Sequence, residues 1–184
     1  DVTELLEENN RLTITVGKGW YRSPMPGFAA SPYQESLMKQ PAGLLVQLML
    51  EYADGTCETI VSDETWKYAE SKIRFSEIYD GEIYDASYES TFDRNAVCFQ
   101  GPSDTLIPQQ GIREQEHIAA ARIFTTPKGE TVIDFGQEVT GYVESTLEGK
   151  TGDVLDLSFA EVMDKEDNFY TENYRSAKAQ YRYI

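Results

Sequence analysis

Apolar and polar residues alternate along much of this chain, and that pattern favours extended structure. From 44 to 52, every second residue is Leu, Val or Tyr. Successive side chains of a strand point to opposite faces, so the pattern is typical of a half-buried strand. The run ends near Asp54-Gly55, and the alternation resumes over 57–61. Asp-Gly between two such runs predicts a β-hairpin.

The remaining segments extend this interpretation to the whole chain. Further strands are predicted at 12–16, 73–75, 78–84, 118–124, 132–135, 142–147 and 154–159, and 181–184 resembles an interrupted strand. Only 3–8 has a helical pattern, with Thr3 as a candidate cap. Gly and Pro residues between about 93 and 115 predict a crossing between two units. We therefore expect an all-β chain of two β-sandwich (jelly-roll-like) units, 1–107 and 108–184, the second of them truncated.

The net negative charge of the chain argues against some classes of binding partner. The chain carries 16 Lys and Arg against 32 Asp and Glu, a formal charge of −16. Nucleic-acid backbones and anionic membranes attract basic surfaces, so we expect neither as a partner. No run approaches the roughly 20 apolar residues of a membrane span, and no secretory signal is visible at the start. The compartment stays open between the cytoplasm and secretion.

Catalytic patterns are missing from the sequence. Hydrolysis of a sugar needs two carboxyl groups across the bond, and nothing here places two acids across a cleft. His117 is the only histidine, and no nucleophile-elbow motif accompanies it. Cys57 and Cys98 match no metal-ligand spacing. We assign no catalytic residue and expect no required cofactor.

Two acidic segments are candidates for a cation. Asp80, Glu82 and Asp85 are close together in sequence and could supply oxygen ligands to a hard cation such as calcium. The favoured alternative is a polar turn, because Asp readily bonds backbone amides in turns. The acidic stretch 164–168 lacks the glycine and the glutamate of a calcium loop at their required positions. It is better interpreted as a hairpin turn.

Aromatic residues offer a candidate carbohydrate site. Trp20 and Tyr21 follow Gly19, and exposed aromatic faces can stack on the apolar faces of sugars. The favoured alternative is a buried indole at a strand end, since tryptophan is highly buried on average.

Polar residues interrupt the apolar run 132–142. Asp134, Gly136, Gln137 and Gly141 lie within it. A buried polar group without a partner costs a few kcal/mol, so the run is either part of a site or a hydrogen-bonded corner. We favour the corner, in which the two glycines permit the backbone turns.

These motifs together resemble a known family. In order, they resemble the N-terminal β-sandwich domains of bacterial α-L-rhamnosidases of glycoside hydrolase family 78. The matching stretches are 16–21, 45–48, 52–56, 59–67, 78–86, 134–137, 141–142, 160–162 and 170–173, with Arg175 and Ala177. The resemblance covers nearly the whole chain. It departs from the family pattern at Glu138, where asparagine is usual.

The resemblance implies a catalytic function for the parent protein and a supporting role for this chain. Enzymes of the family hydrolyse terminal α-L-rhamnose with inversion, using acids in a downstream (α/α)6 barrel. The resemblance therefore implies a catalytically silent chain that supports that barrel, with rhamnose-containing glycosides as ligands of the parent enzyme. In some members the first module binds rhamnose with calcium (carbohydrate-binding module family 67). An independent calcium-dependent rhamnose-binding module and a purely structural spacer remain as alternatives.

Overall fold

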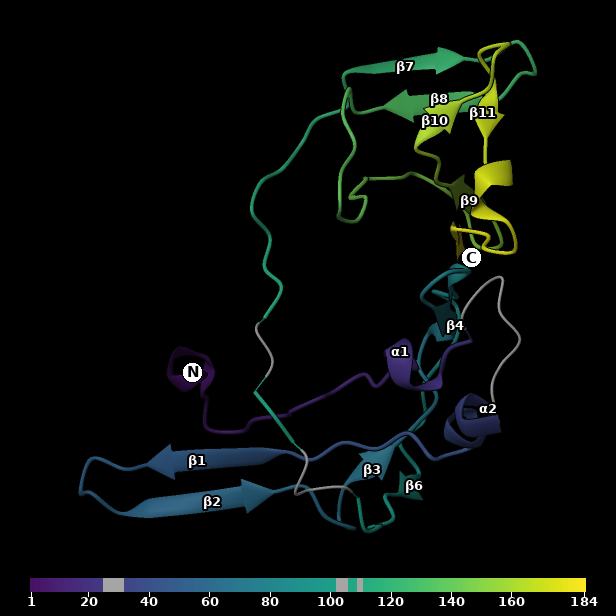
Figure 1. Cartoon of the computed structure of the whole chain (residues 1–184). Coiled ribbons are helices and arrows are strands. Elements are labelled where there is room, and N and C mark those ends of the chain that lie inside the picture. Colours follow the sequence, from purple (N-terminus) through teal and green to yellow (C-terminus); the bar gives the residue numbers. More distant parts are fainter. Residues whose placement is uncertain (25–31, 102–105, 109–110) are drawn as a thin grey trace.

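Short strands make up most of the regular structure. The computed structural model describes residues 1–24, 32–101, 106–108 and 111–184 (Figure 1). Its strands are β1 (Gln47–Glu51), β2 (Cys57–Val61), β3 (Lys67–Tyr68), β4 (Ile73–Glu77), β5 (Gly81–Tyr84), β6 (Arg94–Asn95), β7 (Arg122–Thr125), β8 (Thr131–Asp134), β9 (Leu155–Ser158), β10 (Val162–Met163), β11 (Phe169–Tyr170) and β12 (Gln180–Tyr183). The helical pieces are η1 (Thr3–Leu5), α1 (Gly19–Arg22), α2 (Pro32–Met38) and η3 (Glu172–Tyr174). The all-β prediction is confirmed.

The predicted Asp-Gly hairpin is confirmed. β1 and β2 pair antiparallel from Gln47↔Val61 to Glu51↔Cys57. At the turn, the Gly55 N–H donates to the Tyr52 carbonyl over 2.9 Å, and Gly55 has a φ of +82°. Only glycine adopts such a φ at no steric cost. The hairpin projects from the rest of the chain (Figure 1).

A four-stranded sheet connects the first half of the chain with the second. Its order is β4-β5-β12-β9, with β5 and β12 parallel and the other two pairs antiparallel. β4 and β5 precede residue 107, and β9 and β12 follow it. The division at 107/108 remains a prediction, but this sheet takes two strands from each side of it.

The parallel pairing depends on one glycine. Gly81 faces Gln180 across the β5–β12 ladder and has a φ of +101°. A Cβ at position 81 would lie 1.9 Å from the Gln180 carbonyl oxygen. Any side chain there would therefore force the two strands apart.

Two hairpin turns are bonded to each other in the upper part of Figure 1. β7 pairs with β8, and β10 pairs with β11 around the 164–168 turn, so the hairpin prediction for that acidic stretch is confirmed. Asn168 is only 3% exposed, and its Oδ1 accepts the Lys128 N–H over 3.0 Å. The Phe169 N–H donates to Glu130 over 3.2 Å. These bonds cross between the hairpins and hold them together.

Three local predictions are wrong. Residues 12–16 and 142–147 form no strand, because strand pairing needs a neighbouring strand and none pairs with them within the described part of the chain. The helix predicted at 3–8 is reduced to η1, and Thr3 does not cap it. The Thr3 hydroxyl instead donates to Asp1 over 2.6 Å. Isolated helices this short are marginal in water.

The predicted crossing at 93–115 is mostly irregular. β6 is its one regular element among the residues that the structure describes, and it pairs with β3. Residues 102–105 and 109–110 of the predicted crossing lie outside the described residues. In the described ranges, no helix has the length and apolar character needed to cross a membrane.

The chain leaves much of its apolar surface open. Its accessible surface is 15949 Å², whereas a folded monomer of this mass exposes about 9,000 Å². No hydrophobic side chain is fully buried among the described residues. Elements that would normally pack in layers therefore present faces with no covering layer.

Candidate functional site

Helix α1 places the predicted aromatic pair beside the β4–β5 hairpin. The Trp20 ring meets the Tyr79 ring edge-on, with 5.6 Å between centroids. The Lys18 ammonium lies 5.4 Å from the centre of the Phe75 ring. Two contacts therefore bring the segment around α1 against the hairpin that carries the predicted acids.

Both aromatic side chains remain accessible. Trp20 is 67% exposed and Tyr21 is 56% exposed. The alternative of a buried indole at a strand end therefore does not describe Trp20 here, since it lies on a short helix and keeps most of its surface in solvent. A free aromatic face of this size can stack on the C–H face of a sugar ring. A role in carbohydrate binding stays a prediction.

The three predicted metal ligands have separate surroundings. Asp80 pairs with Lys178 at 3.5 Å. Asp85 accepts hydrogen bonds from the Ser87 hydroxyl and N–H, and the hydroxyl bond is the main cause that lowers the Asp85 pKa. Glu82 instead lines an open cleft together with Tyr142 and Phe159. In the described part of the chain, no three acidic, histidine or cysteine side chains are grouped for a metal. Calcium binding stays a prediction.

A buried carboxylate shapes the turn between β4 and β5. Glu77 is 8% exposed, and its Oε2 accepts the N–H groups of Tyr79 and Asp80 over 3.0 and 3.1 Å. Burial alone would raise the pKa of Glu77, but these backbone hydrogen bonds outweigh it and hold the pKa below the ordinary 4.5. The turn that presents Tyr79 and Asp80 thus depends on an ionised Glu77.

This arrangement predicts a pH-dependent contribution to stability. A carboxyl whose pKa is lower in the folded state stabilises the fold above its unfolded pKa, near 4.5, and loses that effect as the pH falls through the folded value. We expect Glu77→Gln to be less stable than the parent chain at pH 7. The difference should shrink steadily below about pH 4.5. Urea unfolding at a series of pH values measures it, and a difference that is constant with pH would contradict the assignment.

The polar residues of the 132–142 run lie at a corner after β8. Asp134 Oδ1 accepts the Gly136 N–H over 2.7 Å, and Oδ2 pairs with Arg122 at 2.8 Å. The backbone bond is the main cause that lowers the Asp134 pKa. Gly136 has a φ of +75°, whereas Gly141 does not have a positive φ. The Gln137 side chain makes no hydrogen bond to any of the described residues.

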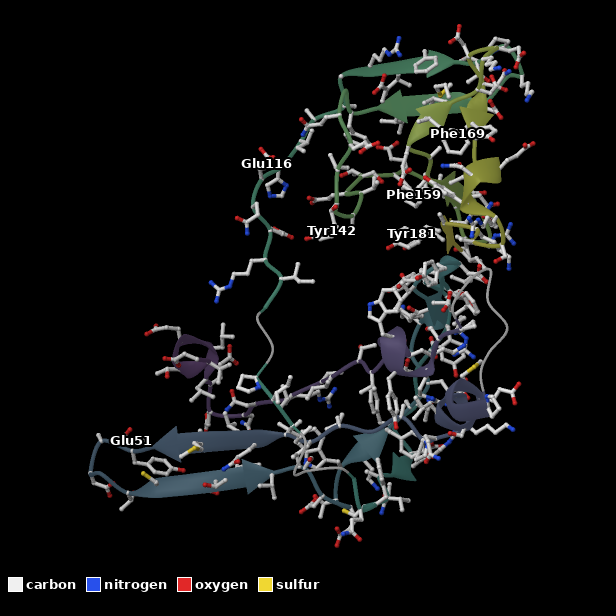
Figure 2. All side chains as sticks on the ribbon, viewed as in Figure 1. Glu51, Glu116, Tyr142, Phe159, Phe169 and Tyr181 are labelled. Carbon is white, nitrogen blue, oxygen red and sulfur yellow. The ribbon has the colours of Figure 1, made fainter. Side chains whose placement is uncertain are left out.

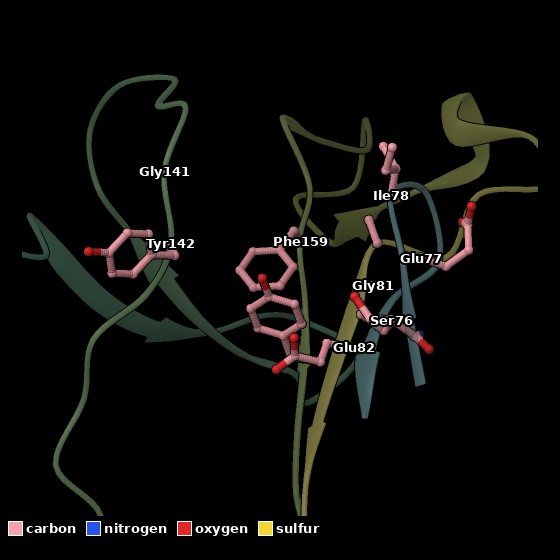
Figure 3. A pocket seen from close by; sticks show the side chains of 11 residues that line it. Ser76, Glu77, Ile78, Gly81, Glu82, Gly141, Tyr142 and Phe159 are labelled. Atoms are coloured by element: carbon pink, nitrogen blue, oxygen red, sulfur yellow. The ribbon is translucent and has the colours of Figure 1, made fainter. Parts of the chain in front are cut away.

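The structure also places together side chains that no sequence pattern grouped. An open cleft of about 320 Å³ lies between the β4–β5 hairpin, β12 and two segments of the later chain (Figure 3). Its aromatic lining is Tyr142, Phe159 and Tyr181, with Glu82 beside them. These residues come from distant parts of the sequence, so no local spacing could have indicated the cleft.

Comparison with known proteins gives two adjoining matches. Residues 1–126 match the family described as the alpha-L-rhamnosidase N-terminal domain. Residues 124–184 match the bacterial alpha-L-rhamnosidase concanavalin-like domain, which agrees with the predicted β-sandwich class. An alpha-L-rhamnosidase of Streptomyces avermitilis is 36% identical, over 97% of this chain and 18% of its own length. One of Formosa agariphila is 31% identical, over 100% of this chain and 21% of its own length.

Solved structures give the same result. The S. avermitilis alpha-L-rhamnosidase complexed with L-rhamnose aligns with a TM-score of 0.71 and 32% identity, over 90% of this chain and 17% of the other. The native enzyme of Aspergillus terreus aligns with a TM-score of 0.70 and 28% identity, over 78% of this chain and 18% of the other. The chain thus spans about a fifth of the length of the curated relatives that it matches.

Proposed function

Because the chain belongs to the family of alpha-L-rhamnosidase N-terminal domains, we propose that it is a non-catalytic β-sandwich part of an α-L-rhamnosidase. Its role is to pack against the catalytic part of that enzyme, an (α/α)6 barrel, and to support it. The parent enzyme hydrolyses terminal α-L-rhamnose from glycosides.

The observation that carries this proposal is the large open surface with its many exposed apolar side chains. The chain exposes 15949 Å² in total where about 9,000 Å² is normal for its mass, and none of its hydrophobic side chains is buried among the described residues. Large exposed apolar patches on soluble proteins generally mark interaction surfaces. The relatives contain some five times as much chain, which is enough polypeptide to cover these faces. A supporting domain that is completed by its neighbour accounts for both facts.

A chimera tests the supporting role. We expect the S. avermitilis relative to stay soluble and to hydrolyse a rhamnosyl aryl-glycoside when this chain replaces its matching segment. Deletion of that segment without replacement should cost soluble, active enzyme, because apolar faces of the remainder would lose their cover. Equal activity and solubility in the two proteins would contradict the support role.

The isolated chain should itself release no product from the same glycoside. Measurable turnover that is lost when one of its own acids is substituted would show that catalysis lies within it.

A second function, sugar binding, is favoured by the exposure of Trp20 and Tyr21. Here the chain would hold rhamnose on these rings, with calcium from the Asp80, Glu82 and Asp85 segment as an accessory ion. We expect titration with rhamnose to shift the NMR signal of the Trp20 indole N–H at millimolar sugar, because aromatic stacking changes its shielding. The shift should grow when calcium is added. The same titration of Tyr68→Ala, which changes an exposed ring elsewhere, is the control. No shift in either condition would leave support as the only role.

A further inference from the structure

The cleft lined by Tyr142, here named the Tyr142 cleft, is separate from the Trp20–Tyr21 surface. It is formed by Ser76, Glu77, Ile78, Gly81, Glu82, Gly141, Tyr142, Phe159, Ala179, Gln180 and Tyr181. Neither aromatic ring of α1 belongs to this lining. Its volume of about 320 Å³ lies at the lower end of the range of small-molecule sites.

Aromatic rings form one part of the lining. Phe159 and Tyr181 meet edge-to-face, with centroids 5.3 Å apart and planes at 82°. That contact holds the two rings against each other. Tyr142 lies across the opening from Phe159 (Figure 3), and it is 65% exposed. Figure 2 places the same three rings on separate segments that converge. The cleft thus offers apolar faces on two sides.

Polar groups complete the lining. The half-buried Glu82 faces Tyr181 across the β5–β12 ladder and has no side-chain hydrogen bond or ion pair to any described residue. The Gln180 amide group is held by the Ser158 hydroxyl, to which it donates over 3.3 Å, and this leaves its carbonyl oxygen to accept. Ser76 adds a hydroxyl. The lining therefore offers both acceptors and donors, as suits a ligand that is rich in hydroxyl groups.

We propose that the Tyr142 cleft binds a neutral pyranose ring. Aromatic faces on two sides suit the C–H faces of the sugar, and Glu82 and Gln180 suit its hydroxyl groups. Glu82 and the charge of −16 oppose an anionic sugar. The mixture of polar and apolar lining is unsuited to a lipid chain. The inference goes beyond the proposed function, because the cleft is a different place from the Trp20–Tyr21 surface and shares only Glu82 with the roles given above.

Ligand-observed saturation-transfer NMR on the 184-residue chain tests the proposal. The probes are methyl α-L-rhamnopyranoside and the anionic methyl β-D-glucuronide. All measurements use a Trp20→Ala, Tyr21→Ala background, which removes the first candidate sugar surface. We expect saturation transfer to the neutral glycoside and little to the glucuronide, because Glu82 repels the carboxylate.

Two further variants assign the signal to the cleft. Tyr142→Ala should abolish transfer, and Tyr142→Phe should retain it, because the ring and not its hydroxyl makes the contact. The side chain is largely exposed, so its loss should leave the fold intact, and circular dichroism checks this. Transfer that is undiminished in Tyr142→Ala, equal transfer to both probes, or no transfer at all would overturn the proposal. The last result would indicate that polypeptide of the parent enzyme fills the cleft. Failure here leaves the chimera result unaffected, so the two proposals fail independently.

Discussion

Gly81→Ala is expected to destabilise the chain by about 2–5 kcal/mol, through backbone strain at positive φ and overpacking against the neighbouring strand. The new Cβ would lie 1.9 Å from the Gln180 carbonyl oxygen, a distance that no rotamer can relieve. The strands β5 and β12 must then separate, and the sheet loses its link between the early and late halves of the chain. Urea unfolding measures the free energy, and hydrogen exchange of the β12 amides should accelerate.

Gly152→Ala is the matched control for that substitution. Gly152 has a φ of +93°, close to that of Gly81, but a Cβ there would meet nothing within 4 Å. It should therefore cost only the backbone strain, about 1–2 kcal/mol. If both substitutions cost the same, the close approach of β12 to Gly81 is not present in solution.

Asn168→Ala is expected to cost about 2 kcal/mol, the typical effect of leaving a buried polar group unpaired. Its side chain is almost fully buried, and it accepts the Lys128 N–H from the neighbouring hairpin turn. Its amide group also donates to both oxygens of Asp164, each over 3.2 Å. Removing it leaves that N–H unsatisfied and frees the β7–β8 turn from the β10–β11 turn. Urea unfolding and exchange of the Lys128 amide are the measurements.

Asn173→Ala supplies the comparison for Asn168. Asn173 is exposed on η3, and its side chain makes no hydrogen bond in the described part of the chain. Surface changes of this kind usually stay within about 0.5 kcal/mol. A loss for Asn168→Ala no larger than that for Asn173→Ala would mean that the two turns are not coupled.

Local patterns predicted much of this fold because several strands pair with a near neighbour. The Asp54-Gly55 hairpin follows from a turn signal between two alternating runs. β9 falls within a segment predicted as a strand, and β8 overlaps another. Residues 12–16 alternate just as clearly but have no partner strand in the described structure. An alternating pattern shows that a segment could form a half-buried strand. Whether it does so depends on a neighbouring strand with which it can pair.

Contacts between segments that are distant in sequence could not be predicted from local sequence patterns. The parallel pairing of β5 with β12 joins segments that no local rule connects. The Tyr142 cleft depends on that pairing, because Tyr181 reaches Glu82 only when the two strands lie side by side. Trp20 and Tyr21 were selected by residue type, but their exposure on α1 could be known only from the structure.

The β5–β12 pairing also means that, during synthesis, β5 must wait for its partner strand. Gly81 and Gln180 pair although they are 180 − 81 = 99 residues apart. At synthesis rates of about 5–20 residues per second, β5 is finished roughly 5–20 s before β12 exists. During that interval the β4–β5 hairpin keeps an unpaired strand edge, of the kind that invites pairing with other chains. Nascent chains are therefore at greatest risk of aggregation after the first half is complete and before the last strand emerges.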